Sequence, residues 1–282
     1  MSTLATSPFV DGYVFLEGPR WHDGRLWVSD IWAHKVYGIE EDGRAEIAAE
    51  VPGRPSGLGF LPDGTPLIVS MHDRCVYRLE HGVLQLHADL SRVASAEIND
   101  MVVDDQGRAY VGNFGFNTHE NAEGPLADLI RVDPDGSASI AAEGFHFPNG
   151  AVITPDGKTL IIGETRANRL SAFDVAADGS LSNRRVWADL GENYPDGICL
   201  DAEGAVWVAD PRNKETIRVK EGGDVTMRVS TGARGSFACM LGGDDRKTLY
   251  ICTSGGSGPK AAERRDGCIE SIRVAVPGAG WP

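Results

Sequence analysis

Two short apolar runs separated by a turn recur along the chain. The runs are rich in Val, Ile, Leu and Trp, and the turn between them is of the Asp-Gly type, a combination that predicts a β-hairpin. The pattern appears in residues 18–30, 57–70, 100–112, 150–163, 197–210 and 238–252. Its turns return roughly every 40 to 50 residues, which is a spacing typical of propeller blades.

Further strand-like pieces follow the hairpins, for example in residues 35–39, 75–79 and 169–173. Four strands per unit at this period predict an all-β fold, a six-bladed β-propeller with four-stranded antiparallel blades around a central channel. A β-sandwich is the alternative, but it does not predict six matching hairpins. We expect residues 1–282 to form a single domain, with the strand around residues 13–16 completing the last blade and closing the ring.

Composition narrows the class of protein. The 282 residues are 41% hydrophobic and 24% charged, which is ordinary for a globular chain. A net charge of −14 argues against a nucleic-acid partner and against anionic membrane surfaces. The first residues lack a basic and apolar leader, no stretch is apolar enough to span a membrane, and the five cysteines show no CxxC spacing. These features predict a cytoplasmic protein with reduced cysteines.

The hairpin alignment also locates candidate chemistry. In a propeller the first strand of each blade lines the channel, so the residues just before the aligned segments gather at one mouth. We call these the mouth positions: Glu17, Ser56, Asn99, Asn149, Asp196 and Phe237. Four of them, from four different blades, carry carboxylate or amide oxygens.

Two carboxylates and two amides around one axis predict a site for one hard divalent cation. Oxygen ligands suit Ca²⁺, Mg²⁺ or Mn²⁺, whereas Zn²⁺ usually takes His or Cys, and neither occurs at the mouth positions. Without a cation, two facing acids would repel each other. The alternative is that Asn149-Gly150 and Asp196-Gly197 are ordinary turn formers, although this does not account for Glu17.

The same residues carry a family resemblance. Four motifs lie in residues 16–21, 98–100, 147–151 and 194–198, with the sequences Leu-Glu-Gly-Pro-Arg-Trp, Ile-Asn-Asp, Phe-Pro-Asn-Gly-Ala and Tyr-Pro-Asp-Gly-Ile. They resemble those of the family of senescence marker protein (regucalcin), gluconolactonase and luciferin-regenerating enzyme, over about residues 17–272. The resemblance implies a six-bladed propeller with one catalytic divalent metal that hydrolyses sugar lactones.

The resemblance also implies roles for single residues. Glu17, Asn149 and Asp196 match metal ligands, and Asn99 matches a position that binds the metal or holds its water and the substrate. Asp196 matches the general base. We expect calcium as the cofactor, with zinc, magnesium or manganese as alternatives. A cation would polarise a lactone carbonyl and a carboxylate would take the proton of the attacking water. Because ligation lowers the basicity of Asp196, a cation-bound hydroxide is the competing nucleophile.

Specificity is where the chain departs from the family. Sugar lactonases of the regucalcin type carry an arginine two residues before the motif asparagine, and here that position is Glu97. The reversed charge argues against an acidic sugar substrate but permits a neutral aldonolactone, unless Glu97 points to solvent. Further candidates for substrate contact are Trp32, Asn117, His119 and His146.

Other candidates for the rim of the mouth follow the second strands of the blades: Met71, His72, Asn113, Phe114, Glu164, Asp210 and Arg212. Several of these side chains are bulky and apolar. They favour a substrate less polar than a free sugar. The sequence therefore favours a metal-dependent lactonase acting on a small-molecule lactone or ester. Hydrolysis of other esters or organophosphates at the same metal, and a non-catalytic calcium-binding propeller, remain alternatives.

Overall fold

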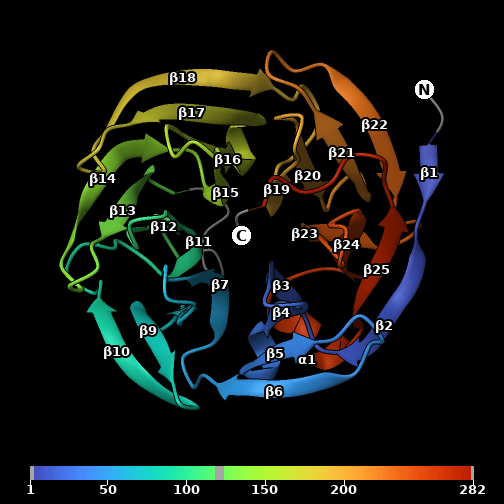
Figure 1. Cartoon of the computed structure of the whole chain (residues 1–282), viewed down its shortest axis with the longest axis horizontal. Coiled ribbons are helices and arrows are strands. Elements are labelled where there is room, and N and C mark those ends of the chain that lie inside the picture. The colour runs from blue at the N-terminus through green and yellow to red at the C-terminus, as the bar shows by residue number, and fades with distance from the viewer. Residues whose placement is uncertain (1–2, 118–123, 281–282) are drawn as a thin grey trace.

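Six antiparallel sheets surround a central channel in the computed structural model, which describes residues 3–117 and 124–280 (Figure 1). The innermost strand of each sheet contacts the innermost strands of both neighbouring sheets, which closes the inner wall of the channel. These first strands are β3 (Leu16–His22), β7 (Pro55–Phe60), β11 (Ile98–Val103), β15 (Pro148–Ile153), β19 (Ile198–Leu200) and β23 (Gly235–Gly242). The predicted six-bladed β-propeller is therefore confirmed.

Each first strand turns back through the predicted hairpin into a second strand. The second strands are β4 (Arg25–Asp30), β8 (Pro66–Ser70), β12 (Ala109–Asn113), β16 (Thr159–Glu164), β20 (Val206–Asp210) and β24 (Thr248–Ser254). All six hairpin turns place a glycine at positive φ, as Gly64 does at 85°. The sixth turn has Gly243 at φ 85° and also Arg246 at φ 55°.

The third and fourth strands lie toward the outside of the ring. The third strands are β5 (Lys35–Ile39), β9 (Cys75–Glu80), β13 (Ala127–Val132), β17 (Arg169–Val175), β21 (Glu215–Val219) and β25 (Gly267–Arg273). The fourth strands are β6 (Ala45–Glu50), β10 (Val83–Asp89), β14 (Ala138–Phe145), β18 (Leu181–Asp189), β22 (Val225–Ser230) and β2 (Ser7–Tyr13). Exposed apolar side chains such as Val83 and Val186 belong to these outer strands, whereas β7, β11 and β15 are buried throughout.

The N-terminal segment closes the ring, but earlier in the chain than the sequence indicated. The closing strand is β2, which pairs antiparallel with β25, whereas Leu16 already begins β3. The apolar residues 14–16 are buried because they lead into the core, not because they form an outer strand. The preceding β1 (Thr3–Ala5) adds a fifth strand to another blade by pairing parallel with β22.

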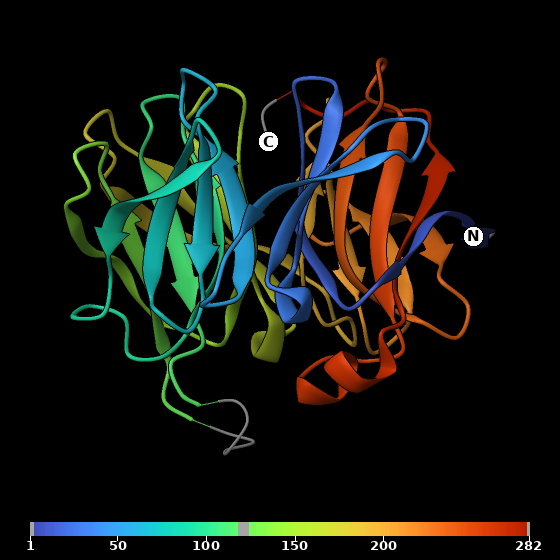
Figure 2. The ribbon, with the colours of Figure 1, turned by 90° about the horizontal axis from the view of Figure 1, so that it is seen from below.

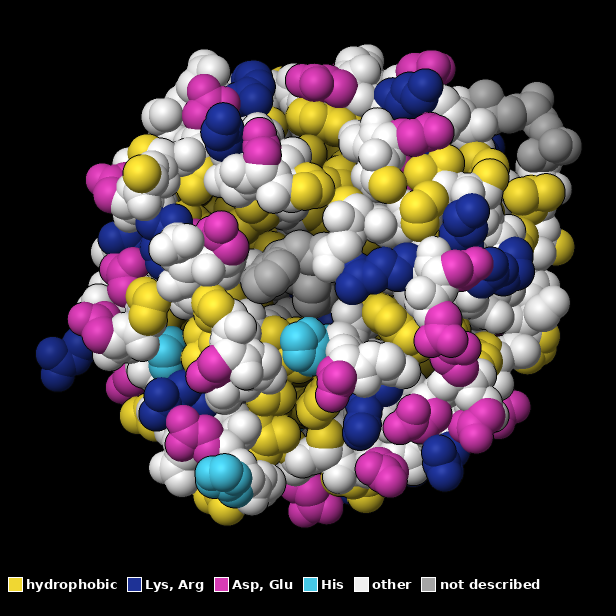
Figure 3. Space-filling view, viewed as in Figure 1, with side chains coloured by type: hydrophobic (Ala, Val, Ile, Leu, Met, Phe, Trp, Pro, Cys, Tyr) yellow, Lys and Arg dark blue, Asp and Glu magenta, His cyan; other side chains and the backbone are white. Residues whose placement is uncertain are grey.

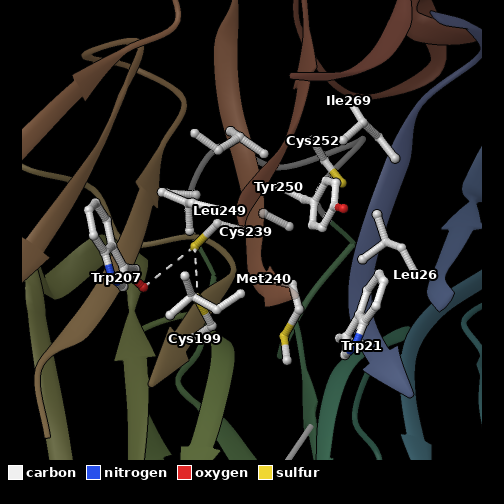
Figure 4. Packing of buried hydrophobic residues seen from close by; sticks show 14 of the residues in the cluster. Trp21, Leu26, Cys199, Trp207, Cys239, Met240, Leu249, Tyr250, Cys252 and Ile269 are labelled. Carbon is white, nitrogen blue, oxygen red and sulfur yellow. Dashed lines mark hydrogen bonds between the residues drawn. The ribbon is translucent and has the colours of Figure 1, made fainter. Parts of the chain in front are cut away.

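Between the blades, apolar side chains of adjacent sheets interlock. The largest cluster joins the fifth, sixth and first blades and includes Trp207, Cys239 and Trp21, one from each of them (Figure 4). All five cysteines are free, and the four buried ones are small core residues, whereas Cys75 is half-buried. In this cluster the thiol of Cys239 lies 3.6 Å from the backbone oxygen of Trp207.

The C-terminal segment covers one end of the channel. Its backbone bonds to two blades: Gly278 N donates to Arg246 O (2.9 Å) and Ala279 N donates to Leu200 O (3.0 Å). The C-terminal end and the short helix α1 (Pro259–Arg264) lie on opposite faces of the ring (Figure 2). On the face with the C-terminal end, acidic and basic side chains are interspersed (Figure 3). Within the described ranges, none of the helices is long and apolar enough to cross a bilayer.

Candidate functional site

The mouth positions meet at a β-bulge in the first strands. In β3, Glu17 pairs with Ser29 of β4 and Arg20 pairs with Trp27, so three residues of β3 lie opposite two residues of β4. The first strands β7, β11 and β15 contain the same one-residue insertion. A bulge leaves its extra residue outside the ladder and re-aims the side chains beside it. The bulge therefore accounts for the way Glu17, Asn99 and Asn149 turn toward one axis, whereas Asp196 precedes β19, whose pairing with β20 is regular.

The glycines that follow the mouth positions are needed for blade packing, not for turns. Gly150 and Gly197 are buried between neighbouring first strands. A Cβ on Gly150 would lie 2.5 Å from Ile198 N, and one on Gly197 would lie 2.6 Å from the Cβ of Ala238. Asn149-Gly150 lies inside β15 and is therefore not a turn, whereas Gly197 is at a bend just before β19.

A pocket of ≈ 490 Å³ opens over this ring. Glu17, Asn99, Asn149, Asp196 and Phe237 all line it, so the structure brings together the four predicted oxygen-bearing residues. Ser56, the mouth position of the second blade, supports them from beside the pocket. The rest of the wall combines polar side chains (Arg54, Glu97, Thr165, Arg212 and Ser257) with aromatic and aliphatic ones that include Phe15, Ile31, Trp32, Met71, Phe114 and Phe147.

A chain of hydrogen bonds fixes the two asparagines. The Ser56 hydroxyl donates to Asn99 Oδ1 (2.8 Å), and Asn99 Nδ2 donates to Asn149 Oδ1 (3.3 Å). Asn149 Nδ2 then donates to the hydroxyl of Thr165 (3.2 Å), which itself donates to Pro195 O (2.6 Å). Such supporting residues orient the side chains that contact a ligand. Thr165, which also lines the pocket, lies outside the mouth positions and directly after the rim candidate Glu164.

The two carboxylates at the mouth are costly in their charged form. Burial, followed by the Asp196 and Asp100 carboxylates, raises the pKa of Glu17 well above its ordinary value. Burial likewise raises the pKa of Asp196, with Asp100 and Asp210 adding to it and a hydrogen bond from Asn149 opposing it. Below them, Asp100 is held by Arg20 at 3.0 Å, and this buried pair supplies only one positive charge.

The donor set fits a hard cation. Residues 3–117 and 124–280 place no group of three or more His, Cys, Asp or Glu side chains where it could hold a metal ion. The mouth instead offers two carboxylates and the amides of Asn99 and Asn149, an all-oxygen set of the kind that Ca²⁺ prefers. A divalent cation would also balance the two acidic charges and remove their repulsion.

Glu97 does not point freely to solvent. Its carboxylate pairs with the guanidinium of Arg54 and lies 3.2 Å from His72 Nδ1. Arg54 in turn lies over the ring of Trp32, 4.8 Å from its centroid. Glu97, Arg54 and Trp32 all line the pocket, so an arginine of the neighbouring blade lies beside position 97. Arg54 could not be found by the search of mouth positions, since it lies two residues before Ser56.

The other candidates for substrate contact lie farther out. Asn117 is exposed and lines a neighbouring hollow that it shares with Arg54 and Glu97. His146 is exposed and is not among the residues that line the main pocket. His119 lies outside the described residues.

The acids that end two of the second strands are supports rather than rim residues. Glu164 and Asp210 are fully buried. Glu164 accepts a hydrogen bond from His146 N (3.0 Å), and Asp210 accepts one from Tyr194 N (2.9 Å). They thereby hold the segments that lead into Asn149 and Asp196. Glu164 and Asp210, which the sequence suggests as rim residues, thus hold the backbone just before the first strands β15 and β19.

We expect Glu164→Gln to destabilise the protein through lost charge–charge contacts. Hydrogen bonds from Arg169, His146, Ser171 and Arg184 oppose burial and lower the pKa of Glu164 from 4.5 to about 2. A lowered pKa contributes stability above pH 4.5 that is lost as pH falls toward 2, which corresponds to about 3 kcal/mol. Urea unfolding at pH 7 should show that difference between wild type and variant, and at pH 2.5 the difference should shrink. An equal difference at both pH values would contradict this role.

Comparison with known proteins identifies the family of the chain. A family model described as the SMP-30/gluconolactonase/LRE-like region matches residues 15–255. The 6-deoxy-6-sulfogluconolactonase of Pseudomonas putida is 26% identical over 278 residues, covering 94% of this chain and 93% of the relative. The pentonolactonase of Haloferax volcanii is 26% identical over 255 residues, covering 89% and 85%.

Solved structures agree on the fold. A calcium-binding protein, regucalcin, from Agrobacterium tumefaciens superposes with a TM-score of 0.82 at 23% identity, covering 99% of this chain and 97% of the other. A gluconolactonase from Xanthomonas campestris superposes with a TM-score of 0.77 at 22% identity, covering 96% and 89%. The family model spans most of the chain and includes all four oxygen-bearing mouth positions. The chain therefore belongs to the SMP-30/gluconolactonase/LRE-like family.

Proposed function

We propose that the protein hydrolyses a lactone at one divalent cation held by Glu17, Asn149 and Asp196, with help from Asn99. The observation that carries this proposal is the convergence of two mutually repelling carboxylates and two amides on one pocket. Relatives named as lactonases support the reaction type. We expect calcium, while zinc, magnesium and manganese remain alternatives.

The chemistry divides between the cation and the chain. When bound, the cation would act as a Lewis acid toward the lactone carbonyl. Asp196 lines the pocket, and two hydrogen bonds fix its backbone. Its backbone N–H donates to Ala209 O (3.0 Å), and its backbone carbonyl oxygen accepts from Gly150 N (3.1 Å). Its carboxylate is the group in reach to accept the proton of an attacking water. Asn99, fixed by Ser56, would orient that water or the substrate.

The open pocket favours catalysis over calcium binding alone. A purely structural cation site is closed by protein ligands, whereas here ≈ 490 Å³ of space adjoins the donor set. That volume is the size of a small-molecule site. Other esters and organophosphates could enter the same pocket, and an activity assay distinguishes these substrate classes from lactones.

A panel of lactones, aryl esters and organophosphates tests the proposal. The wild-type protein should hydrolyse at least one lactone faster than any aryl ester or organophosphate. EDTA should abolish this activity, and returning Ca²⁺, Mg²⁺, Mn²⁺ or Zn²⁺ should restore it. Activity that is insensitive to EDTA, or no activity on any lactone or ester, would reject the proposal.

A further inference from the structure

A second ring of residues surrounds the mouth positions. Two residues before each of them stand, in blade order, Phe15, Arg54, Glu97, Phe147, Tyr194 and Gly235, which we call the outer ring. Four of these six residues line the pocket. Tyr194 instead supports a pocket residue, because the guanidinium of Arg212 lies 4.1 Å from the centroid of its ring. The repeat therefore builds the wall of the pocket as well as its base.

One wall of the pocket is built around Phe147. This residue has φ 63°, a left-handed conformation that is rare for a bulky side chain and concentrates at functional sites. Its ring stacks on Phe114, with centroids 4.9 Å apart and planes at 28°. Both rings are only half-buried and both line the pocket. The strained backbone thus presents an aromatic surface to whatever occupies the pocket.

The facing wall is also apolar. Phe15 of the outer ring packs edge-on against Phe237, with ring centroids 4.8 Å apart. Gly235 leaves the room for Phe237, because a Cβ there would lie 2.9 Å from its ring. Ile31 and Trp32 extend this wall.

The polar members of the outer ring largely satisfy each other. Arg54 and Glu97 form an ion pair between neighbouring blades, so neither charge requires a substrate group for compensation. A substrate with many hydroxyl groups would set some of them against the aromatic walls, where they find no hydrogen-bond partner and lose hydration. An apolar substituent at the same place gains from leaving water.

We propose that the outer ring selects a lactone whose ring carries an apolar substituent, which packs between the Phe114–Phe147 and Phe15–Phe237 walls. This inference rests on the proposed lactonase function and names its substrate class. Phe147 is accordingly a specificity-determining residue. It contributes to the recognition of the substituent and not to the opening of the lactone ring.

A series of γ-lactones, compared with one sugar δ-lactone, tests the inference. Unsubstituted γ-butyrolactone, its methyl, propyl and hexyl derivatives, and glucono-1,5-lactone are compared by kcat/KM on the calcium-loaded wild-type protein. Burial of a methylene group predicts a gain of roughly threefold to fourfold in kcat/KM for each added carbon, until the pocket is filled. Glucono-1,5-lactone should fall below the propyl derivative.

Two variants identify the wall. Phe147→Ala removes the ring, and Phe147→Gly also removes the strain of a positive φ, so a folding defect confined to the alanine variant is recognised. In both, the gain in kcat/KM per added carbon should drop below about twofold. Phe9→Ala, which truncates a ring packed on Tyr250 away from the pocket, should keep the wild-type dependence on chain length.

The outcomes separate the two proposals. If lactones are hydrolysed but glucono-1,5-lactone is the better substrate, or chain length has no effect, the outer-ring inference is overturned and the lactonase proposal stands. An unchanged gain per carbon in both Phe147 variants overturns the role of that wall. If no lactone or ester is hydrolysed, both proposals fall together.

Discussion

Replacing Asp196 by asparagine is expected to lower lactone turnover by about a thousandfold or more. The substitution keeps the shape of the side chain but removes one of two carboxylates that would hold the cation and the group placed to accept a proton. The measurement is kcat/KM on the best lactone of the panel. Wild-type turnover in Asp196→Asn would exclude Asp196 as the base.

A matched control variant and a measurement of stability show whether Asp196→Asn loses activity merely because it unfolds. Asp63 also precedes a glycine, but it is exposed in a hairpin turn, so Asp63→Asn should leave turnover unchanged. Because burial raises the pKa of Asp196, its charge is costly in the cation-free protein. With EDTA present, Asp196→Asn should therefore melt at the same temperature as wild type or higher. A lower melting temperature would indicate that activity was lost through unfolding.

Removing the cation should abolish turnover and also destabilise the protein in a pH-dependent way. A ligand at a hundred times its Kd stabilises the folded state by about 2.7 kcal/mol, which corresponds to a rise in Tm of about 5 °C for a domain of this size. Calorimetry of the protein in EDTA and in excess Ca²⁺ measures this difference.

The pH dependence follows from the sign of the pKa shifts. Glu17 and Asp196 have raised pKa values in the cation-free folded protein, so they retain protons there that the unfolded chain releases. Their contribution to stability is therefore present below the ordinary carboxyl pKa, near 4, and is lost as pH rises toward the raised values. A cation requires both groups charged, so its stabilising effect should grow between pH 5 and pH 8. A Ca²⁺-induced rise in Tm that is the same at both pH values would contradict this account.

The repeat made most of the fold predictable. Six hairpins of equal pattern indicate six blades, and each glycine turn is a local signal that needs no tertiary context. The sequence predicts the closing strand too late in the chain, because the pairing of β2 with β25 joins the two ends of the sequence and leaves no local pattern. The parallel pairing of β1 with β22 is equally remote and has no local signal.

The candidate site was predictable as far as its residues share one repeat position. Each of these residues stands directly before an aligned hairpin and lines the same pocket, so an alignment of hairpins finds Glu17, Asn99, Asn149 and Asp196 together. The partners of Glu97 could not be found in this way, because its ion pair with Arg54 joins side chains of different blades. Glu164 suggested a rim residue because sequence does not distinguish a buried capping carboxylate from one that faces the pocket.

The most direct test of the central claim is a calorimetric titration of the chelated protein with Ca²⁺. The account predicts that wild type binds one equivalent with release of protons, and that Glu17→Gln binds none in the same concentration range. Mn²⁺ and Mg²⁺ titrations of wild type would then rank the cations. Binding of Ca²⁺ to Glu17→Gln with wild-type stoichiometry and affinity would show that the mouth positions do not hold the cation.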